Sequence, residues 1–156
     1  MDLRKLRAGE SLAGLSGVAL IAAMAFLNWF GVDVPPGTEP VGGFDAFRAF
    51  DVIDVVLLLT AIVAIALPLL TATQTRTNLP IVTSVFVAIL GIVSAIALLF
   101  RILVPPDLSG ARFALDFEPL NTGFETTRAI GVFIGLIAVI GIATGGWLAM
   151  RDERSG

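Results

Sequence analysis

Four long stretches of the chain contain no charged side chain, and charged or turn-forming residues separate them. Each stretch has at least about 20 residues, enough for a helix to cross the roughly 30 Å hydrocarbon core of a bilayer. Lipid offers no partners to backbone amides, so each stretch should be helical. The pattern predicts an all-α membrane protein, a four-helix transmembrane bundle forming one domain over residues 1–156. The predicted spans are 11–32, 55–75, 77–100 and 129–150, with long loops at 33–54 and 101–128.

The composition supports a membrane protein and narrows its chemistry. Hydrophobic residues make up 56% of the chain, and the mean hydropathy is +0.94. The chain has no cysteine and no histidine, which excludes disulfides, thiolate or imidazole metal sites, and the commonest general base. We therefore expect no catalytic residues, no cofactor and no metal, and we do not expect an enzyme. Membrane lipid and other membrane subunits are the expected partners, and nucleic acid is not.

The positions of the basic residues predict the orientation. Arg4, Lys5 and Arg7 form a cluster before the first span, and such a cluster usually stays in the cytoplasm. With an even number of spans, both termini should be cytoplasmic and both long loops outside, in the plasma (inner) membrane. Trp29 and Trp147 lie at opposite ends of the first and fourth spans, where interfacial aromatic residues are expected.

Two short phrases occur twice in the same order. The phrase F-x3-V-P-P spans residues 30–36 and 100–106, and the phrase G-F-[D/E]-x2-R-A spans residues 43–49 and 123–129. This pattern indicates a tandem repeat of two helical hairpins, related by a pseudo-twofold axis along the membrane normal. The alternative is convergence, because Pro-Pro commonly ends a helix and arginine commonly lies near a helix end.

The long loops contain their own periodic patterns. Three phenylalanines at helical spacing predict a short amphipathic helix over residues 44–51. Residues 112–118 alternate between apolar and polar, which predicts a strand. It could pair with the extended stretch 32–34 to form a small extracellular β element. Thr122 and Glu125 have the spacing of a capping box, which would start the fourth helix.

Charged side chains gather at the outer edge of the predicted spans. One interpretation is a vestibule that attracts ions or binds a substrate, and the other is a salt-bridge network that fixes the hairpins. No charged residue lies at mid-membrane, which argues against proton relays and ion-coupled carriers. Asp54 lies about one turn inside the polar boundary, so it should seek a cation, and Arg101 is a plausible partner. This charge cluster comprises Arg48, Asp51, Asp54, Arg101 and Arg128.

The fourth span has one face made almost entirely of small residues. These residues lie within about 120° of arc around a helix with 100° per residue, so they would let another backbone approach closely. The sequence predicts that this face packs along another helix, and it leaves open whether that helix belongs to the same bundle or to a second subunit. The small-residue face comprises Gly131, Gly135, Ala138, Gly141, Gly145 and Ala149.

The chain resembles a broad group of membrane proteins. The Asn28-Trp29-Phe30 exit from the first span, the re-entry at 43–49 and the leucine- and alanine-rich second span are similar to small four-span proteins of unassigned function from high-GC Gram-positive-type bacteria. Claudins and connexins are similar in topology only, because their extracellular cysteines are absent here. The resemblance implies no activity.

Two functions follow as expectations. The first is a non-enzymatic integral membrane protein that self-associates or serves as a subunit or scaffold of a membrane complex. The alternative is an oligomeric channel or simple transport protein with an acidic extracellular vestibule. Polar residues in the spans are too sparse to line a pore within one chain, so a pore would have to lie between subunits.

Overall fold

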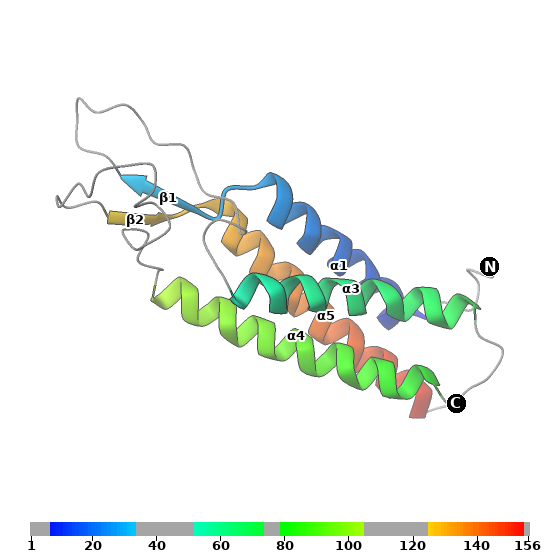
Figure 1. Ribbon diagram of the computed structural model, residues 1–156. Helices are drawn as coiled ribbons and strands as arrows, with labels where there is room; N and C mark the ends of the chain where they lie inside the picture. Colours follow the sequence, from blue (N-terminus) through cyan, green and yellow to red (C-terminus); the bar gives the residue numbers. More distant parts are fainter. Residues whose placement is uncertain (1–6, 34–51, 74–78, 105–124, 155–156) are drawn as a thin grey trace.

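Four long helices make up most of the described protein. The computed structural model describes residues 7–33, 52–73, 79–104 and 125–154 (Figure 1). Each of its four long helices is long and apolar enough to cross a membrane, and they pack together, which confirms the prediction of a helical, membrane-type bundle. The helices are α1 (Ala8–Phe26), α3 (Val52–Thr73), α4 (Leu79–Leu103) and α5 (Ile130–Arg154).

The order of the helices around the bundle follows the chain. Helix α1 packs against α3 and α5, and α4 packs against the same two helices, so α1 lies diagonally opposite α4. The start of α1 and the end of α5 lie at the same end of the bundle (Figure 1). Each helix therefore runs antiparallel to its two neighbours, as in an up-and-down four-helix bundle.

A two-stranded sheet lies at the other end of the bundle (Figure 1). Strand β1 (Phe30–Asp33) pairs antiparallel with β2 (Glu125–Arg128), with Phe30 opposite Arg128. The pairing continues beyond the strands, because the amide of Ala129 donates to the carbonyl of Trp29 over 3.0 Å. The sheet thus joins the segment that follows α1 to the segment that precedes α5.

The sheet explains where the sequence-based boundaries were wrong. The first span was expected to run to residue 32, but α1 ends at Phe26 and the chain becomes extended. The backbone amides of β1 find hydrogen-bond partners through the pairing with β2, so this segment does not need to be helical. Glu125 lies in β2 and α5 begins at Ile130, so the proposed capping box does not start this helix. The amphipathic helix expected at 44–51 and the strand expected at 112–118 lie outside the described residues.

The described parts of the first repeated phrase, residues 30–33 and 100–104, have different structures in the two copies. Phe30 begins β1 and is fully buried, whereas Phe100 lies within α4 and is 58% exposed. The difference arises because α4 continues as a helix to Leu103, while the chain after α1 has already entered the sheet. The first copy of the second phrase, residues 43–49, lies outside the described residues.

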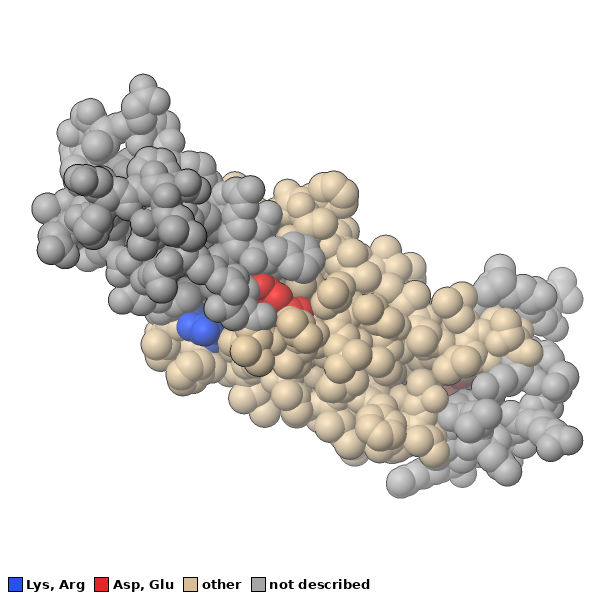
Figure 2. All heavy atoms as spheres, viewed as in Figure 1, with Lys and Arg blue, Asp and Glu red and all other residues tan. Residues whose placement is uncertain are grey.

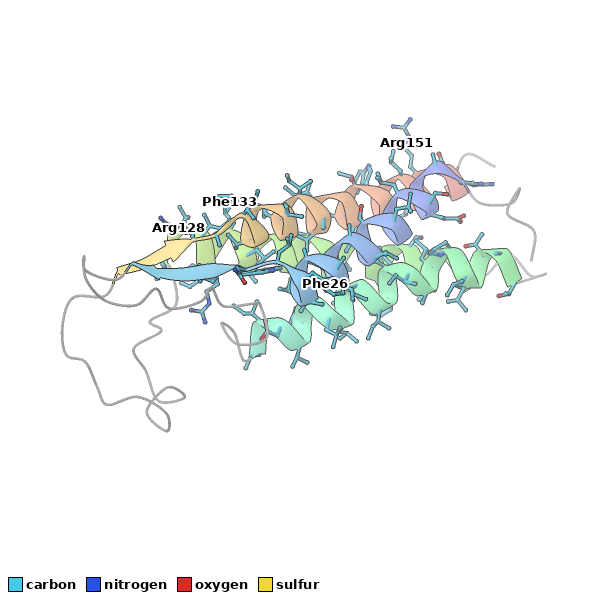
Figure 3. The ribbon with its side chains drawn as sticks, turned by 90° about the horizontal axis from the view of Figure 1, so that it is seen from above. Phe26, Arg128, Phe133 and Arg151 are labelled. Atoms are coloured by element: carbon cyan, nitrogen blue, oxygen red, sulfur yellow. The ribbon has the colours of Figure 1, made fainter. Side chains whose placement is uncertain are left out.

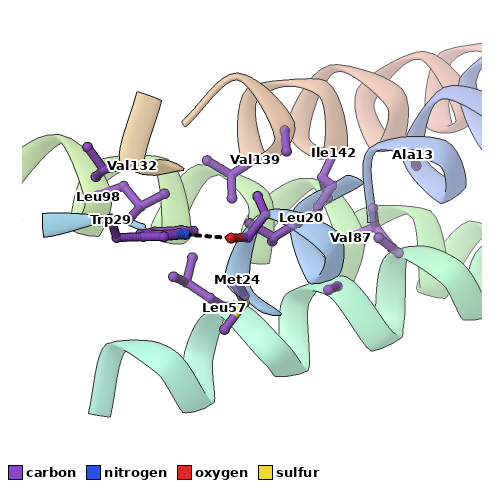
Figure 4. Packing of buried hydrophobic residues seen from close by; sticks show 14 of the residues in the cluster. Ala13, Leu20, Met24, Trp29, Leu57, Val87, Leu98, Val132, Val139 and Ile142 are labelled. Carbon is purple, nitrogen blue, oxygen red and sulfur yellow. Dashed lines mark hydrogen bonds between the residues drawn. The ribbon is translucent and has the colours of Figure 1, made fainter. Parts of the chain in front are cut away.

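The hydrophobic core runs along the bundle, and its largest fully buried side chain, Trp29, lies near the sheet end (Figure 4). Its indole is fully buried, and Nε1 donates a 2.8 Å hydrogen bond to the carbonyl of Ala23, which satisfies the one polar atom of the ring. Trp29 is therefore a core residue and does not face lipid. Trp147, in contrast, is 57% exposed. Fully buried side chains from all four helices surround Trp29, among them Leu20, Leu57, Leu98 and Val132.

Candidate functional site

The small-residue face of α5 lies against α1. An added Cβ at Gly145 would lie 2.5 Å from the backbone nitrogen of Ala13 and 2.8 Å from the carbonyl oxygen of Gly9. Seen from the other side, an added Cβ at Gly9 would lie 2.7 Å from the carbonyl oxygen of Gly145. Such distances leave no room for a side chain, so the two backbones are in direct contact along this stretch.

The same face continues toward the sheet. An added Cβ at Gly131 would lie 2.5 Å from the carbonyl oxygen of Asn28, and one at Gly135 would overlap the ring of Trp29. Gly141 faces the side chain of Ser16 in the middle of α1. The remaining members of the face, Ala138 and Ala149, are buried. The face therefore contacts α1 and the segment after it, within the same chain.

Two further close contacts use glycines that the sequence analysis did not select. Gly146 packs against the backbone of Ala88, and Gly91 of α4 packs against the backbone of Ala143. Helix α5 therefore approaches α4 through one face and α1 through another. The adjacent glycines Gly145 and Gly146 were the available signal, because neighbouring residues on a helix point about 100° apart and so serve two different contacts.

Helix α3 approaches α1 through another pair of glycines. An added Cβ at Gly14 would lie 2.7 Å from Cγ of Pro68, and one at Gly17 would lie 2.9 Å from the carbonyl oxygen of Ala61. The proline ring of α3 thus fits where α1 has no side chain. Because small residues serve the α1–α3, α1–α5 and α4–α5 contacts, dispersion between closely spaced backbones is a main source of cohesion in this bundle.

The structure places part of the predicted charge cluster at the sheet end of the bundle. Asp54 lies in the first turn of α3 and is 5% exposed, and Arg101 lies in the last turn of α4 and is partly buried. The two helices are antiparallel neighbours, so both residues are at the same end. Arg128 is exposed in β2, and its Nε donates to the carbonyl oxygen of Ile102. Arg48 and Asp51 lie outside the described residues.

The contact made by Arg128 has a structural role. It places a cation at the carboxyl end of α4, where backbone carbonyls lack partners within the helix and the helix dipole is negative. It also connects β2 to α4, so the sheet is attached to a third segment of the chain. Of the two interpretations of the cluster, this contact fits a network that fixes the hairpins.

A polar pair connects α3 and α4 inside the bundle. The hydroxyl groups of Thr60 and Ser94 are 2.8 Å apart, and both side chains are buried. Thr60 Oγ1 also lies 2.7 Å from the carbonyl oxygen of Val56, to which it can donate. These hydroxyls satisfy each other and the backbone, so they act as an interhelical contact.

Glu10 is a buried carboxylate that the sequence analysis did not select. It is 2% exposed, and Oε2 accepts a 3.0 Å hydrogen bond from the amide of Arg7. Oε1 accepts a 3.1 Å hydrogen bond from the hydroxyl of Thr71 on α3. The available signal was a glutamate at the third position of the first helix, which is suited to capping. Glu10 thus fixes the start of α1 and ties it to α3.

The described residues offer no metal centre. They contain no group of three or more histidine, cysteine, aspartate or glutamate residues that could hold a metal ion. On the face shown in Figure 2, a broad band without charged side chains separates the charged side chains at the two ends. No protein-family model, curated protein or solved structure matches the chain. The resemblance to small bacterial four-span proteins therefore stays an expectation from the sequence.

Proposed function

We propose that the chain is a non-enzymatic integral membrane protein that self-associates or serves as a subunit or scaffold of a membrane complex. The observation that carries this proposal is the use of polar groups inside the bundle. The buried hydroxyls of Thr60 and Ser94 bond to each other, and both oxygens of Glu10 accept hydrogen bonds within the chain. These groups are engaged in holding helices together, which favours a structural role over catalysis.

The outer surface of α4 supports association with another membrane helix. Only 28% of its candidate membrane span is buried inside the chain, compared with 33% for α3 and 44% for α1 and for α5. Large side chains cover its outside, among them Phe86, Ile89, Ile96 and Phe100. A second helix that packs on this surface would add dispersion contacts, because side chains of this size interlock between helices. We therefore propose α4 as the main contact with another subunit.

The proposal includes an orientation and a repeat. The basic cluster before α1 supports cytoplasmic termini in the plasma membrane, with the sheet outside. The diagonal placement of α1 and α4, and of α3 and α5, supports a duplicated hairpin, because a twofold axis along the bundle would exchange these helices. The different structures at Phe30 and Phe100 count against duplication at the first repeated phrase.

The stoichiometry of the chain in native lipid tests the proposal. The full chain would be extracted with its surrounding lipid and weighed intact by native mass spectrometry. We expect a fixed stoichiometry, either with itself or with one second membrane subunit. Ile96→Ala on α4 should lower the associated fraction, whereas Ile137→Ala, on the outside of α5, should not. Single copies without a stoichiometric partner would refute the proposal.

Electron microscopy of the same extracted complexes separates the channel alternative. A channel would require a ring of subunits around an open, polar axis. Thr144 is an exposed polar residue of the described spans. Its hydroxyl donates a hydrogen bond to the carbonyl of Ile140 in its own helix. A ring with an open axis would favour the channel, and a closed bundle or a complex with a second subunit would favour the scaffold.

A further inference from the structure

Helices α1 and α5 are joined from one end of the bundle to the other. Their close contacts begin where Gly9 meets the backbone of Ala149, and they recur at the opposite end, where Gly131 meets the carbonyl oxygen of Asn28. The amide of Gly131 also donates a 3.0 Å hydrogen bond to this carbonyl, and beyond the helices β1 pairs with β2. The two helices and the sheet therefore form one unit, which we call the α1–α5 pair.

Helices α3 and α4, the α3–α4 pair, approach this unit closely from the middle of the bundle to the end away from the sheet. In these contacts a glycine lies against the backbone or the proline ring of a neighbouring helix, at Gly17–Ala61, Gly14–Pro68, Gly91–Ala143 and Gly146–Ala88. Gly17 and Gly91 lie at the centres of α1 and α4, and the other two contacts lie farther from the sheet. The hydrogen bond between Thr71 and Glu10 also lies in that half.

Toward the sheet, the two pairs meet through large side chains. Trp29 belongs to the α1–α5 pair, because its ring lies against Gly135 and its Nε1 donates to the carbonyl of Ala23. Leu57 of α3 and Leu98 of α4 are fully buried in the same apolar cluster as Trp29 (Figure 4). In this half, side chains form the contact that glycines and backbones form in the other half.

The two kinds of contact differ in what their separation costs in a membrane. Acyl chains are as apolar as leucine side chains, so lipid replaces much of what two large apolar side chains lose when they part. Close backbone packing at glycines provides many dispersion contacts at once, and these are lost together. The sheet half therefore parts more readily than the other half. The hydrogen bond between Thr60 and Ser94 keeps α3 and α4 together in the sheet half.

A hydrogen bond connects the two pairs at the sheet end. Arg128 of β2 is exposed, and its Nε donates to the carbonyl oxygen of Ile102 in the last turn of α4. We propose that the α3–α4 pair swings away from Trp29 at the sheet end, with the glycine contacts of the other half as the hinge and Arg128 as the latch. Opening exposes the ring of Trp29 to acyl chains. The proposal requires membrane insertion of the bundle but not the proposed subunit function.

Spin-label distances in lipid bilayers test this movement. The chain has no cysteine, so introduced cysteines alone carry the labels. Val55→Cys with Phe133→Cys spans the bundle from α3 to α5 at the sheet end, and Leu69→Cys with Trp147→Cys spans it near the other end. All four positions are exposed. We expect a second, longer distance at the sheet end and a single narrow distribution at the other end.

Variants of Arg128 test the latch. Arg128→Ala should raise the fraction of the longer distance about fivefold, because it removes one hydrogen bond from a charged donor. Arg128→Lys keeps a cationic donor and should restore most of the closed state. Arg128 and Arg151 lie at opposite ends of the bundle (Figure 3). Arg151→Ala is therefore the matched control and should leave the distances at the sheet end unchanged.

The fluorescence of Trp29 gives an independent readout. The chain has two tryptophans, so Trp147→Phe leaves Trp29 as the one emitting indole. Lipids with brominated acyl chains should quench this emission more strongly when Arg128→Ala is added. Unchanged quenching would contradict an opening toward lipid.

Two results of the distance measurements would overturn the proposal. One is an equally narrow distribution at both ends of the bundle, and the other is an unchanged fraction of the longer distance in Arg128→Ala. Circular dichroism checks the fold of each variant. If Arg128→Ala does not fold, the comparison of the two ends with Arg128 in place decides.

Discussion

Replacing Gly145 by alanine should separate α1 from α5. The new methyl carbon would lie 2.5 Å from the backbone nitrogen of Ala13 and 2.8 Å from the carbonyl oxygen of Gly9. Ordinary contacts begin at about 3.5 Å, so the clash amounts to about 1 Å. Both obstructing atoms belong to the backbone and cannot rotate away. The helices must therefore move apart as units, and neighbouring contacts along the small-residue face weaken with them.

The size of the effect follows from two opposing terms. Overpacking of a closely packed site typically costs about 1–3 kcal/mol, and two backbone clashes place this site at the upper end of that range. Alanine is a better helix former than glycine by about 1 kcal/mol, which offsets part of the cost. We expect a net loss of about 1–2 kcal/mol in the free energy of unfolding, or roughly a 5- to 30-fold change in the unfolding equilibrium.

Unfolding in mixed micelles would measure this loss. The protein in a mild detergent is titrated with sodium dodecyl sulfate while the helix content is followed by circular dichroism. Gly31→Ala is the matched control, because nothing lies within 4 Å of an added Cβ there, and its effect should stay within about 0.5 kcal/mol. If Gly145→Ala is as stable as the unaltered protein, the backbones are not in contact and the reasoning fails.

Three further predictions concern the ends and the interior of the bundle. Glu10→Ala should lower the free energy of unfolding by about 1–2 kcal/mol in the same titration, because a helix start loses its acceptor; an unchanged midpoint would contradict this. A double-mutant cycle with Thr60→Val and Ser94→Ala should give a coupling free energy of about 0.6 kcal/mol, the typical size for such pairs in membranes. A coupling of zero would show that the two hydroxyl groups do not stabilise the bundle through each other. A cysteine at Ser109 should react with an impermeant thiol reagent in intact cells and one at Thr75 should not, whereas the reverse pattern would invert the orientation.

The sequence predicted the structure best where the lipid environment permits only one backbone conformation. Charge-free windows of about 20 residues must be helices, so the existence of the four spans followed directly. The end of the first span did not follow, because residues 30–32 contain no charged side chain, like the rest of the predicted span. They form β1 only because residues 125–128, distant in the chain, offer a partner strand. Such long-range pairing leaves no signal in local hydropathy.

The small residues of α5 were identifiable from their spacing, but their partner was not. Gly9, which meets Gly145, lies before the window predicted as the first span. The sequence also did not show which side chains near the span ends are buried. Asp54 and Trp29 are near span ends, where both types are ordinary surface residues, yet both are buried. Their burial depends on how distant segments of the chain pack together, which the sequence pattern does not show.

The contact between α1 and α5 has a consequence for biosynthesis. Helix α1 has its glycine-lined partner in α5, and synthesis of the 128 residues from the end of α1 at Phe26 to the end of α5 at Arg154 separates them. At about 5–20 residues per second, α1 waits about 6 to 26 s in the bilayer or its insertion machinery. During that time its glycine surface lacks the contact with α5. The bundle is therefore completed late, in a single event that depends on the C-terminal helix. A chain truncated before α5 cannot complete the bundle.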